Sequence, residues 1–297
     1  MPDAASDSRL ASDTSGVHDA TPLPPAPLRL RACYGLSAVV FWVGYGLLGL
    51  RRSVIRDNLR RSFPERDDRA LRRLRRQFIR RQAEIFAEAL YGARITRDEL
   101  RARVRIADVT LLDAAAAPRP MIFATGHQGN FEWMLLRVSA DLGAGLLALY
   151  KPLRNQWFEA RLQRLRTRFG ARLIPAKSVL RELARFREAR VIGIVADQVP
   201  RTSPEKLWLQ FLHQDTAFYM GPELLGRALR SQVVYVSMHR IDRGRYDIRF
   251  EALNEPGEKL PTGELTERYA RALERDIRND PAGWWWSHKR WKLVRPQ

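Results

Sequence analysis

The sequence predicts an α/β protein with a mostly parallel mixed sheet flanked by helices, and with an N-terminal membrane-anchor helix. Two patterns indicate this fold class: strand-like apolar runs alternate with helical runs from residue 100 onward, and a long uncharged segment precedes them. A chain of 297 residues is also long enough to bury a sizeable core. We expect a disordered tail over 1–27, a transmembrane or membrane-anchor helix over 28–52 and one α/β domain over 53–297.

The N-terminal region divides into a polar tail and an apolar helix. Residues 1–27 are rich in Ser, Asp, Ala and Pro with almost no large apolar side chains, which predicts disorder. Ala32 to Leu50 then runs for 19 residues without a charge, a length that matches the ~30 Å hydrocarbon core of a bilayer. A signal peptide is disfavoured because the run begins late and lacks a small-residue cleavage site. A buried core helix is the alternative, but the flanking arginines and internal glycines favour the membrane.

Positive charge dominates the composition. Lys and Arg number 52 against 33 Asp and Glu, a formal net charge of +19, so the surface attracts nucleic acid, anionic lipid or acidic protein. Residues 51–81 hold 13 arginines and four acidic residues. Directly after a membrane helix, this block predicts binding to anionic headgroups and, by the positive-inside rule, a cytoplasmic domain. Within it, Pro64 should separate two helices, and Leu71, Leu74 and Phe78 begin an inward-facing stripe.

Six strand-like runs are expected: Val104–Ile106, Met121–Thr125, Leu146–Tyr150, Arg190–Ala196, Gln232–Met238 and Tyr246–Phe250. Five helical runs alternate with them: Phe131–Ala140, Trp157–Phe169, Ser178–Glu188, Pro222–Arg230 and Glu264–Asp280. This order predicts a mostly parallel sheet with antiparallel strands near its end. Sites in such sheets collect at the carboxyl ends of strands, and His127 and Asp197 both fall there.

The candidate general base lies in PMIFATGHQGNFEWM, residues 120–134. His127 follows the apolar run and Glu132 opens a helix, which gives a base and a possible orienting carboxylate. The His-x4-Glu spacing alone is weak, because it arises by chance in many proteins. Five residues place two side chains about 140° apart on an ideal helix, so we expect His127 in the preceding turn, where Gly126 and Gly129 permit the bend.

Other candidates are one acid and several cations. Asp197 closes an apolar run and is either a site residue or a structural cap. Arg166 lies on the face of its helix opposite Arg161, Arg164 and Arg168. The ending PAGWWWSHKRWKLVRPQ joins three tryptophans to Lys289 and Arg290, which suits a phosphate site; base stacking and a core-packing tail are the alternatives. No Cys/His cluster, phosphate-cradling glycine loop or nucleophile-elbow serine is present, so we expect neither a metal nor a cofactor.

Six ordered motifs, NLRRSFPE, ATGHQGNFEW, YKPLRN, LRTRFG, VADQ and PAGWWWSHKRWK, resemble the bacterial lipid A late acyltransferases over about residues 35–295. These are the lauroyl and myristoyl transferases of lipopolysaccharide biosynthesis. The resemblance implies that His127 and Glu132 are the catalytic pair, that Arg166 is the functional arginine and that Asp197 is the acid of the Asp-Gln motif. It also implies a single-pass protein of the bacterial inner membrane with an acyltransferase domain on the cytoplasmic side.

The chain departs from the family pattern at two places. Val199-Pro200-Arg201 follows Asp-Gln where the family often has an acid and a glycine, and Gln210-Phe211-Leu212-His213 replaces Phe-Phe-Gly. We expect these differences to bear on the acceptor and the acyl length rather than on the catalytic pair.

The resemblance implies acyl transfer from an acyl carrier protein thioester to a hydroxyl of a lipid A precursor. His127 would remove the hydroxyl proton and Glu132 would orient the imidazole. Backbone amides near Gly129, or Arg166, are the candidate oxyanion donors, while Arg166 is alternatively a partner of Glu132 or of an acceptor phosphate.

Expected partners are acyl carrier protein, a membrane glycolipid acceptor and the anionic membrane surface, with no nucleic acid. Two alternatives stay open. One is transfer to another glycolipid or an aminolipid. The other is a membrane-tethered nucleic-acid-binding protein, for which the sequence holds no recognised motif.

Overall fold

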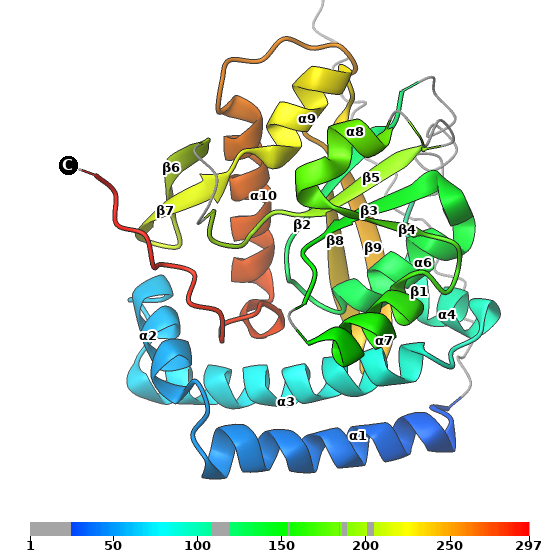
Figure 1. Ribbon diagram of the computed structural model, residues 1–297. Helices are drawn as coiled ribbons and strands as arrows, with labels where there is room; N and C mark the ends of the chain where they lie inside the picture. The colour runs from blue at the N-terminus through cyan, green and yellow to red at the C-terminus, as the bar shows by residue number, and fades with distance from the viewer. Residues whose placement is uncertain are drawn as a thin grey trace, which may run out of the picture.

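The computed structural model describes residues 25–108, 119–153, 155–183, 185, 189–200 and 205–296, so most of the predicted tail lies outside the described residues. A seven-stranded sheet has the order β1-β9-β8-β2-β5-β3-β4, and helices cover it (Figure 1). All neighbouring pairs are parallel except β8 with β9. The predicted fold class, with a mostly parallel sheet and an antiparallel pair near its end, is confirmed.

The strands of the sheet are β1 (Val104–Ile106), β2 (Met121–Thr125), β3 (Leu146–Tyr150), β4 (Arg172–Pro175), β5 (Val191–Val195), β8 (Val233–Asp242) and β9 (Arg245–Ala252). The predictions match β1, β2 and β3 at both ends. They missed β4 and a separate antiparallel hairpin, β6 (Lys206–Phe211) and β7 (Gln214–Tyr219). Neither hairpin strand is a continuous apolar run, because Lys206 and Gln210 flank three apolar residues in β6 and the first half of β7 is polar, which gives a weaker pattern than a buried strand.

Two apolar cores lie on opposite faces of the sheet, as the alternation of side chains along a strand requires. All five residues of β2 are buried. Ile122 and Ala124 join one core, which includes Leu273 of α10, while Met121 and Phe123 join the other, which includes Trp133 of α6. The central strand β2 is therefore buried on both faces, and the polar residues that follow it in sequence lie beyond its carboxyl end.

The domain helices are α4 (Arg97–Arg103), α6 (Phe131–Leu142), α7 (Gln156–Arg166), α8 (Val179–Leu183), α9 (Gly221–Leu229) and α10 (Glu264–Asn279). Four of them were predicted within a few residues of their observed ends, while α4 was not predicted. The helix predicted over Ser178–Glu188 is described only as α8, because part of that range lies outside the described residues.

The N-terminal helices form a layer of their own. α1 (Leu28–Phe41) continues as a π-helix, η1 (Trp42–Leu47), and lies along α3 (Asp68–Gly92) in Figure 1. Leu28–Leu47 is long and apolar enough to cross a membrane. α2 (Arg52–Ser62) follows after a sharp turn, and Pro64 separates it from α3 as predicted.

A buried carboxylate ties α1 to the rest of the protein. Glu88 of α3 has no exposed surface and accepts hydrogen bonds from the hydroxyls of Tyr34 at 2.7 Å and Tyr246 at 2.6 Å. It also accepts from the side-chain amide of Asn130 at 2.8 Å. Burial raises the pKa of Glu88, and the three donors offset part of that shift. One residue therefore joins the anchor helix, the sheet and the start of α6.

Replacing Glu88 with Ala is expected to lower the free energy of unfolding by about 3–5 kcal/mol, because three buried donors lose their acceptor at once. Chemical unfolding of the detergent-solubilised protein measures this. Glu65→Ala is the matched control, since that side chain is 57% exposed and its change should stay within about 0.5 kcal/mol. Equal losses in the two variants would contradict the role of Glu88.

Candidate active site

His127 occupies the turn between β2 and α6. The turn needs glycine at 129, where φ is +64° and an added Cβ would lie 2.8 Å from the carbonyl oxygen of Met238. Asn130 then caps α6, its Oδ1 accepting from the amide of Trp133 at 3.0 Å. The predicted geometry, with His127 in the turn and Glu132 on the first helical turn, matches the structure.

Asp197 holds His127 in place. β2 and β5 are parallel with Thr125 opposite Val195, so the residues just beyond both strands meet at one sheet edge. Asp197 Oδ1 lies 2.6 Å from Nδ1 of His127, and Oδ2 accepts from the His127 amide at 2.8 Å. Because Nδ1 faces a carboxylate, the neutral ring carries its proton on Nδ1 and presents the Nε2 lone pair.

The predicted contact between Glu132 and the imidazole is wrong. Among the described residues, the carboxylate bonded to His127 is that of Asp197. Glu132 instead accepts two bonds from Arg166, at 3.0 Å from Nε and 2.5 Å from Nη2, which was the alternative role for that arginine. The reason is topological: a parallel strand brings a carboxylate 70 residues away closer to the ring than one five residues along the chain.

The Glu132–Arg166 pair joins α6 to α7 beside the histidine. Burial acts to lower the pKa of Arg166, but the hydrogen bonds and charge of Glu132 outweigh it and the pKa is raised. Arg166 therefore stays positively charged, and Nη1 is the donor group that Glu132 does not use.

The Gly129 amide cannot serve as an oxyanion donor in this structure. It donates to the carbonyl oxygen of Gly283 at 3.1 Å, in the bridge that joins the turn to the C-terminal tail. Gly129 itself therefore forms the turn, while donation from the other backbone amides near it stays a prediction.

The three tryptophans of the tail have three different roles. Trp284 donates from Nε1 to Asp197 Oδ2 at 2.8 Å. Trp285 packs edge-on against the His127 ring, with centroids 5.5 Å apart. Trp286 is fully buried and packs against Phe63 of the loop after α2. With two of the three rings buried, the tail is part of the core and the site rather than a platform for base stacking.

Arg290 and Lys289, predicted to hold a phosphate, line neither of the pockets that contain His127. Arg290 is 2% exposed, donates to the carbonyl oxygen of Ala217 at 2.8 Å and stacks on Phe218. Burial lowers its pKa to about 10, so it is a packing residue with no surface for a substrate phosphate. Lys289 is exposed and lines neither of the pockets that contain His127.

Two pockets of different character meet at His127. The apolar pocket has a volume of about 550 Å³, and Phe123, Val138 and Leu146 are among the residues that line it. The polar pocket, of about 310 Å³, is lined by His127, Asp197, Arg51, Ser287 and His288 among others. His127 and Gln198 line both, and the side-chain amide of Gln198 lies 3.1 Å from His127 Nε2. His127 thus lies between an apolar pocket and a polar one.

The sequence matches the family described as bacterial lipid A biosynthesis acyltransferase over residues 22–293, nearly the whole chain. The protein belongs to that family. No curated protein gives a significant match to the chain. Membership agrees with the resemblance carried by the six motifs and supports an acyltransferase of lipid A biosynthesis.

For this acyltransferase, sequence reasoning missed the roles of Gln198 and of the first two tryptophans of the tail. Gln198 sits inside the VADQ motif, so the motif held a usable signal for it. The contact between Trp284 and Asp197 carried no local signal, because the two residues are 87 positions apart.

Asp197 gives a pH-dependent prediction. Burial alone raises its pKa, but the charge and hydrogen bonds of His127 and the Trp284 indole outweigh this and lower the pKa from 3.8 to about 2. The ionised carboxylate therefore stabilises the fold above about pH 4, and this stabilisation is lost as the pH falls toward 2. The gap in unfolding free energy between the wild type and Asp197→Asn should shrink by on the order of 2 kcal/mol between about pH 5 and pH 2.

Urea unfolding at a series of pH values measures that gap. Asp215→Asn is the control, because the Asp215 side chain is 47% exposed and its gap should stay small at every pH. A gap for Asp197→Asn that does not depend on pH would contradict the ion pair.

Proposed function

We propose that the protein transfers a fatty acyl group from an acyl carrier protein thioester to a hydroxyl of a lipid A precursor at the cytoplasmic face of the inner membrane. The position of His127 between the apolar and polar pockets is the observation that carries the proposal. Acyl transfer requires a base next to a site for a hydrocarbon chain and a site for a polar acceptor, and the two pockets meet this need.

The proposed chemistry begins at Nε2 of His127. The acceptor hydroxyl displaces the Gln198 amide from Nε2, and the base takes the hydroxyl proton as the oxygen bonds to the thioester carbon. Asp197 stabilises the imidazolium that forms. The tetrahedral intermediate then collapses, the carbon–sulfur bond breaks, and the leaving thiolate takes the proton back from Nε2.

Arg166 is the proposed donor to the oxyanion, through the Nη1 group that Glu132 leaves unused. Both residues line the apolar pocket together with His127, and the raised pKa of Arg166 keeps its charge in place. Glu132 then acts as a positioning residue that fixes the guanidinium. In this proposal His127 is the general base, and Glu132 positions Arg166 instead of the imidazole.

Charge and composition support the choice of substrates. The net charge of +19 suits an acidic carrier protein as well as a phosphorylated glycolipid in an anionic membrane. The anchor helix would hold the polar pocket at the membrane, since Tyr45 near the end of that helix and Arg51 in the turn after it both line the pocket. The apolar pocket lies within the range of about 300–1,000 Å³ typical of small-molecule sites.

Replacing His127 with Ala should reduce acyl transfer by about 10²–10⁴-fold, the usual effect of losing one general base. The assay incubates membranes with labelled acyl carrier protein and identifies the labelled lipid by mass spectrometry. His213→Asn is the control, because that histidine is exposed and its left-handed backbone tolerates Asn. Near-normal transfer by a folded His127→Ala protein would overturn the proposal, and label in a lipid other than a lipid A precursor would change the acceptor.

Replacing Gly193 with Leu should shorten the preferred acyl chain. Gly193 lines the apolar pocket, and an added Cβ there meets nothing closer than 3.9 Å, so the new side chain can occupy pocket volume without straining the strand. Competition among acyl carrier protein donors of graded chain length should show the longest donor falling about tenfold relative to the shortest.

Gly35→Leu is the matched control for this variant. Gly35 lies on the anchor helix, and nothing lies within 4 Å of an added Cβ. If folded Gly193→Leu uses long and short donors in the same ratio as the wild type, the proposal that the acyl chain lies in the apolar pocket is contradicted.

A further inference from the structure

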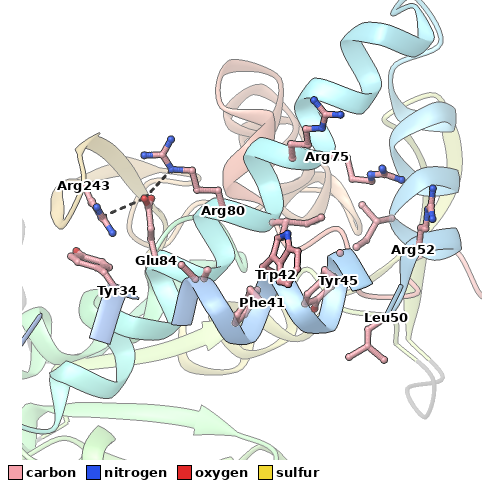
Figure 2. A pocket seen from close by; sticks show the side chains of 16 residues that line it. Tyr34, Phe41, Trp42, Tyr45, Leu50, Arg52, Arg75, Arg80, Glu84 and Arg243 are labelled. Carbon is pink, nitrogen blue, oxygen red and sulfur yellow. Dashed lines mark hydrogen bonds and ion pairs between the residues drawn. The ribbon is translucent and has the colours of Figure 1, made fainter. Parts of the chain in front are cut away.

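A third pocket lies away from His127, between the anchor helix and the α2–α3 pair, with a volume of about 530 Å³ (Figure 2). We call it the interfacial pocket. Its apolar wall comes from Phe41, Trp42 and Tyr45, on the last turns of the anchor helix, and from Ile79 of α3. Phe41 and Tyr45 stack with their centroids 5.3 Å apart. A wall of this kind fits hydrocarbon or other apolar groups.

The two ends of the interfacial pocket differ in charge. At one end Glu84 pairs with Arg80, at 3.3 Å, and with Arg243, at 3.4 Å, as the dashed lines in Figure 2 mark. At the other end Figure 2 shows Arg52 of α2 and Arg75 of α3, and Arg76 also lines the pocket. One end therefore holds a carboxylate that pairs with arginines, whereas the arginines at the other end have no such partner in the described part of the chain.

Among the described residues that line the pocket, none places a carboxylate at the cationic end. The four acidic residues of the 51–81 block are engaged elsewhere: Asp57 with Arg56, Asp68 with Arg60, Glu65 with Arg66, and Asp67 as the cap of α3. Among the described residues, no ion pair joins an acid to Arg52, Arg75 or Arg76. Burial and then the neighbouring arginine charges lower the pKa of Arg75, which reflects this uncompensated repulsion. An anion bound here would relieve it.

We propose that the interfacial pocket binds an anionic glycerophospholipid, with its phosphate on Arg52, Arg75 and Arg76 and an acyl chain along the aromatic wall. Guanidinium groups bind phosphate oxygens through paired, charge-assisted hydrogen bonds. The apolar wall would remain uncovered by a soluble phosphate. Three leucines beside the pocket are 53–70% exposed: Leu47, Leu48 and Leu50. They form an exposed apolar surface of the kind that contacts lipid.

The bound lipid would also brace the catalytic site. Tyr45 lines both the interfacial pocket and the polar pocket beside His127, and Arg51 of the polar pocket directly precedes Arg52. The intervening turn is tight, with positive φ at Gly49 and at Arg51. A lipid that clamps Arg52 thereby restrains the segment that carries Arg51. The binding site itself does not rest on the proposed acyl transfer.

Native mass spectrometry of the full-length protein in detergent, with added phosphatidylglycerol or phosphatidylcholine, tests the site without any acyl donor. The variant Arg52→Gln/Arg75→Gln/Arg76→Gln should bind phosphatidylglycerol about tenfold or more weakly. A charge-matched control, Arg61→Gln/Arg69→Gln/Arg73→Gln, removes three exposed arginines of α2 and α3 that do not line the pocket. It should change binding less than about twofold.

A second variant keeps the charge unchanged. Ala38 is exposed on the anchor helix and lines the interfacial pocket, so Ala38→Trp should exclude the lipid by volume and leave the fold intact. His127→Ala should bind phosphatidylglycerol normally, which separates this site from the catalytic one. Equal losses in the pocket and control triple variants, equal binding of phosphatidylcholine, or full competition by inorganic phosphate would each overturn the proposal.

Discussion

The structure depends on one buried carboxylate. Asp197 is 3% exposed, and an unpaired charge at such depth would be strongly destabilising. It is satisfied by the ring and amide of His127 and by the indole of Trp284, which come from the turn after β2 and from the C-terminal tail. The turn can approach this closely only at Gly126, where an added Cβ would lie 2.7 Å from Leu273 and 3.3 Å from Asp197. The hydrogen bonds of Asp197 therefore join three segments: the end of β5, the turn after β2 and the C-terminal tail.

Buried polar contacts extend this arrangement to the N-terminal helices. Asn58 of α2 donates to the carbonyl oxygens of Trp286 at 2.8 Å and His288 at 2.9 Å, so the tail that supports Asp197 is held by the helix after the anchor. Glu88 links Tyr34 of the anchor to Asn130, the cap of α6. The tail is thus attached to α2, and the end of the turn that carries His127 is attached to α3. These attachments hold the turn that carries His127 in a fixed relation to the N-terminal helices.

Local pattern was a good guide wherever the structure is set by neighbours in sequence. Burial on both faces makes β2 an unbroken apolar run, and glycine with Asn130 marks the turn and the helix start, so His127 was placed correctly. The bonding partner of Glu132 was not, because the pairing of a carboxylate with the histidine depends on which strands are adjacent. Arg290 shows the same limit: the basic tail suggested a phosphate ligand, and the burial of its side chain against Phe218 follows from the path of the tail.

By itself the sequence determined the α/β class, the order of most elements, the apolar helix with its arginine block, and the acyltransferase family through its ordered motifs. These are properties of periodicity, composition and spacing, which a linear chain records directly. Only the tertiary structure decided that Asp197 orients His127, that Glu132 holds Arg166, and that apolar and polar pockets meet at the base. Contacts of this kind join residues tens of positions apart, and they exist only once β2 and β5 lie side by side.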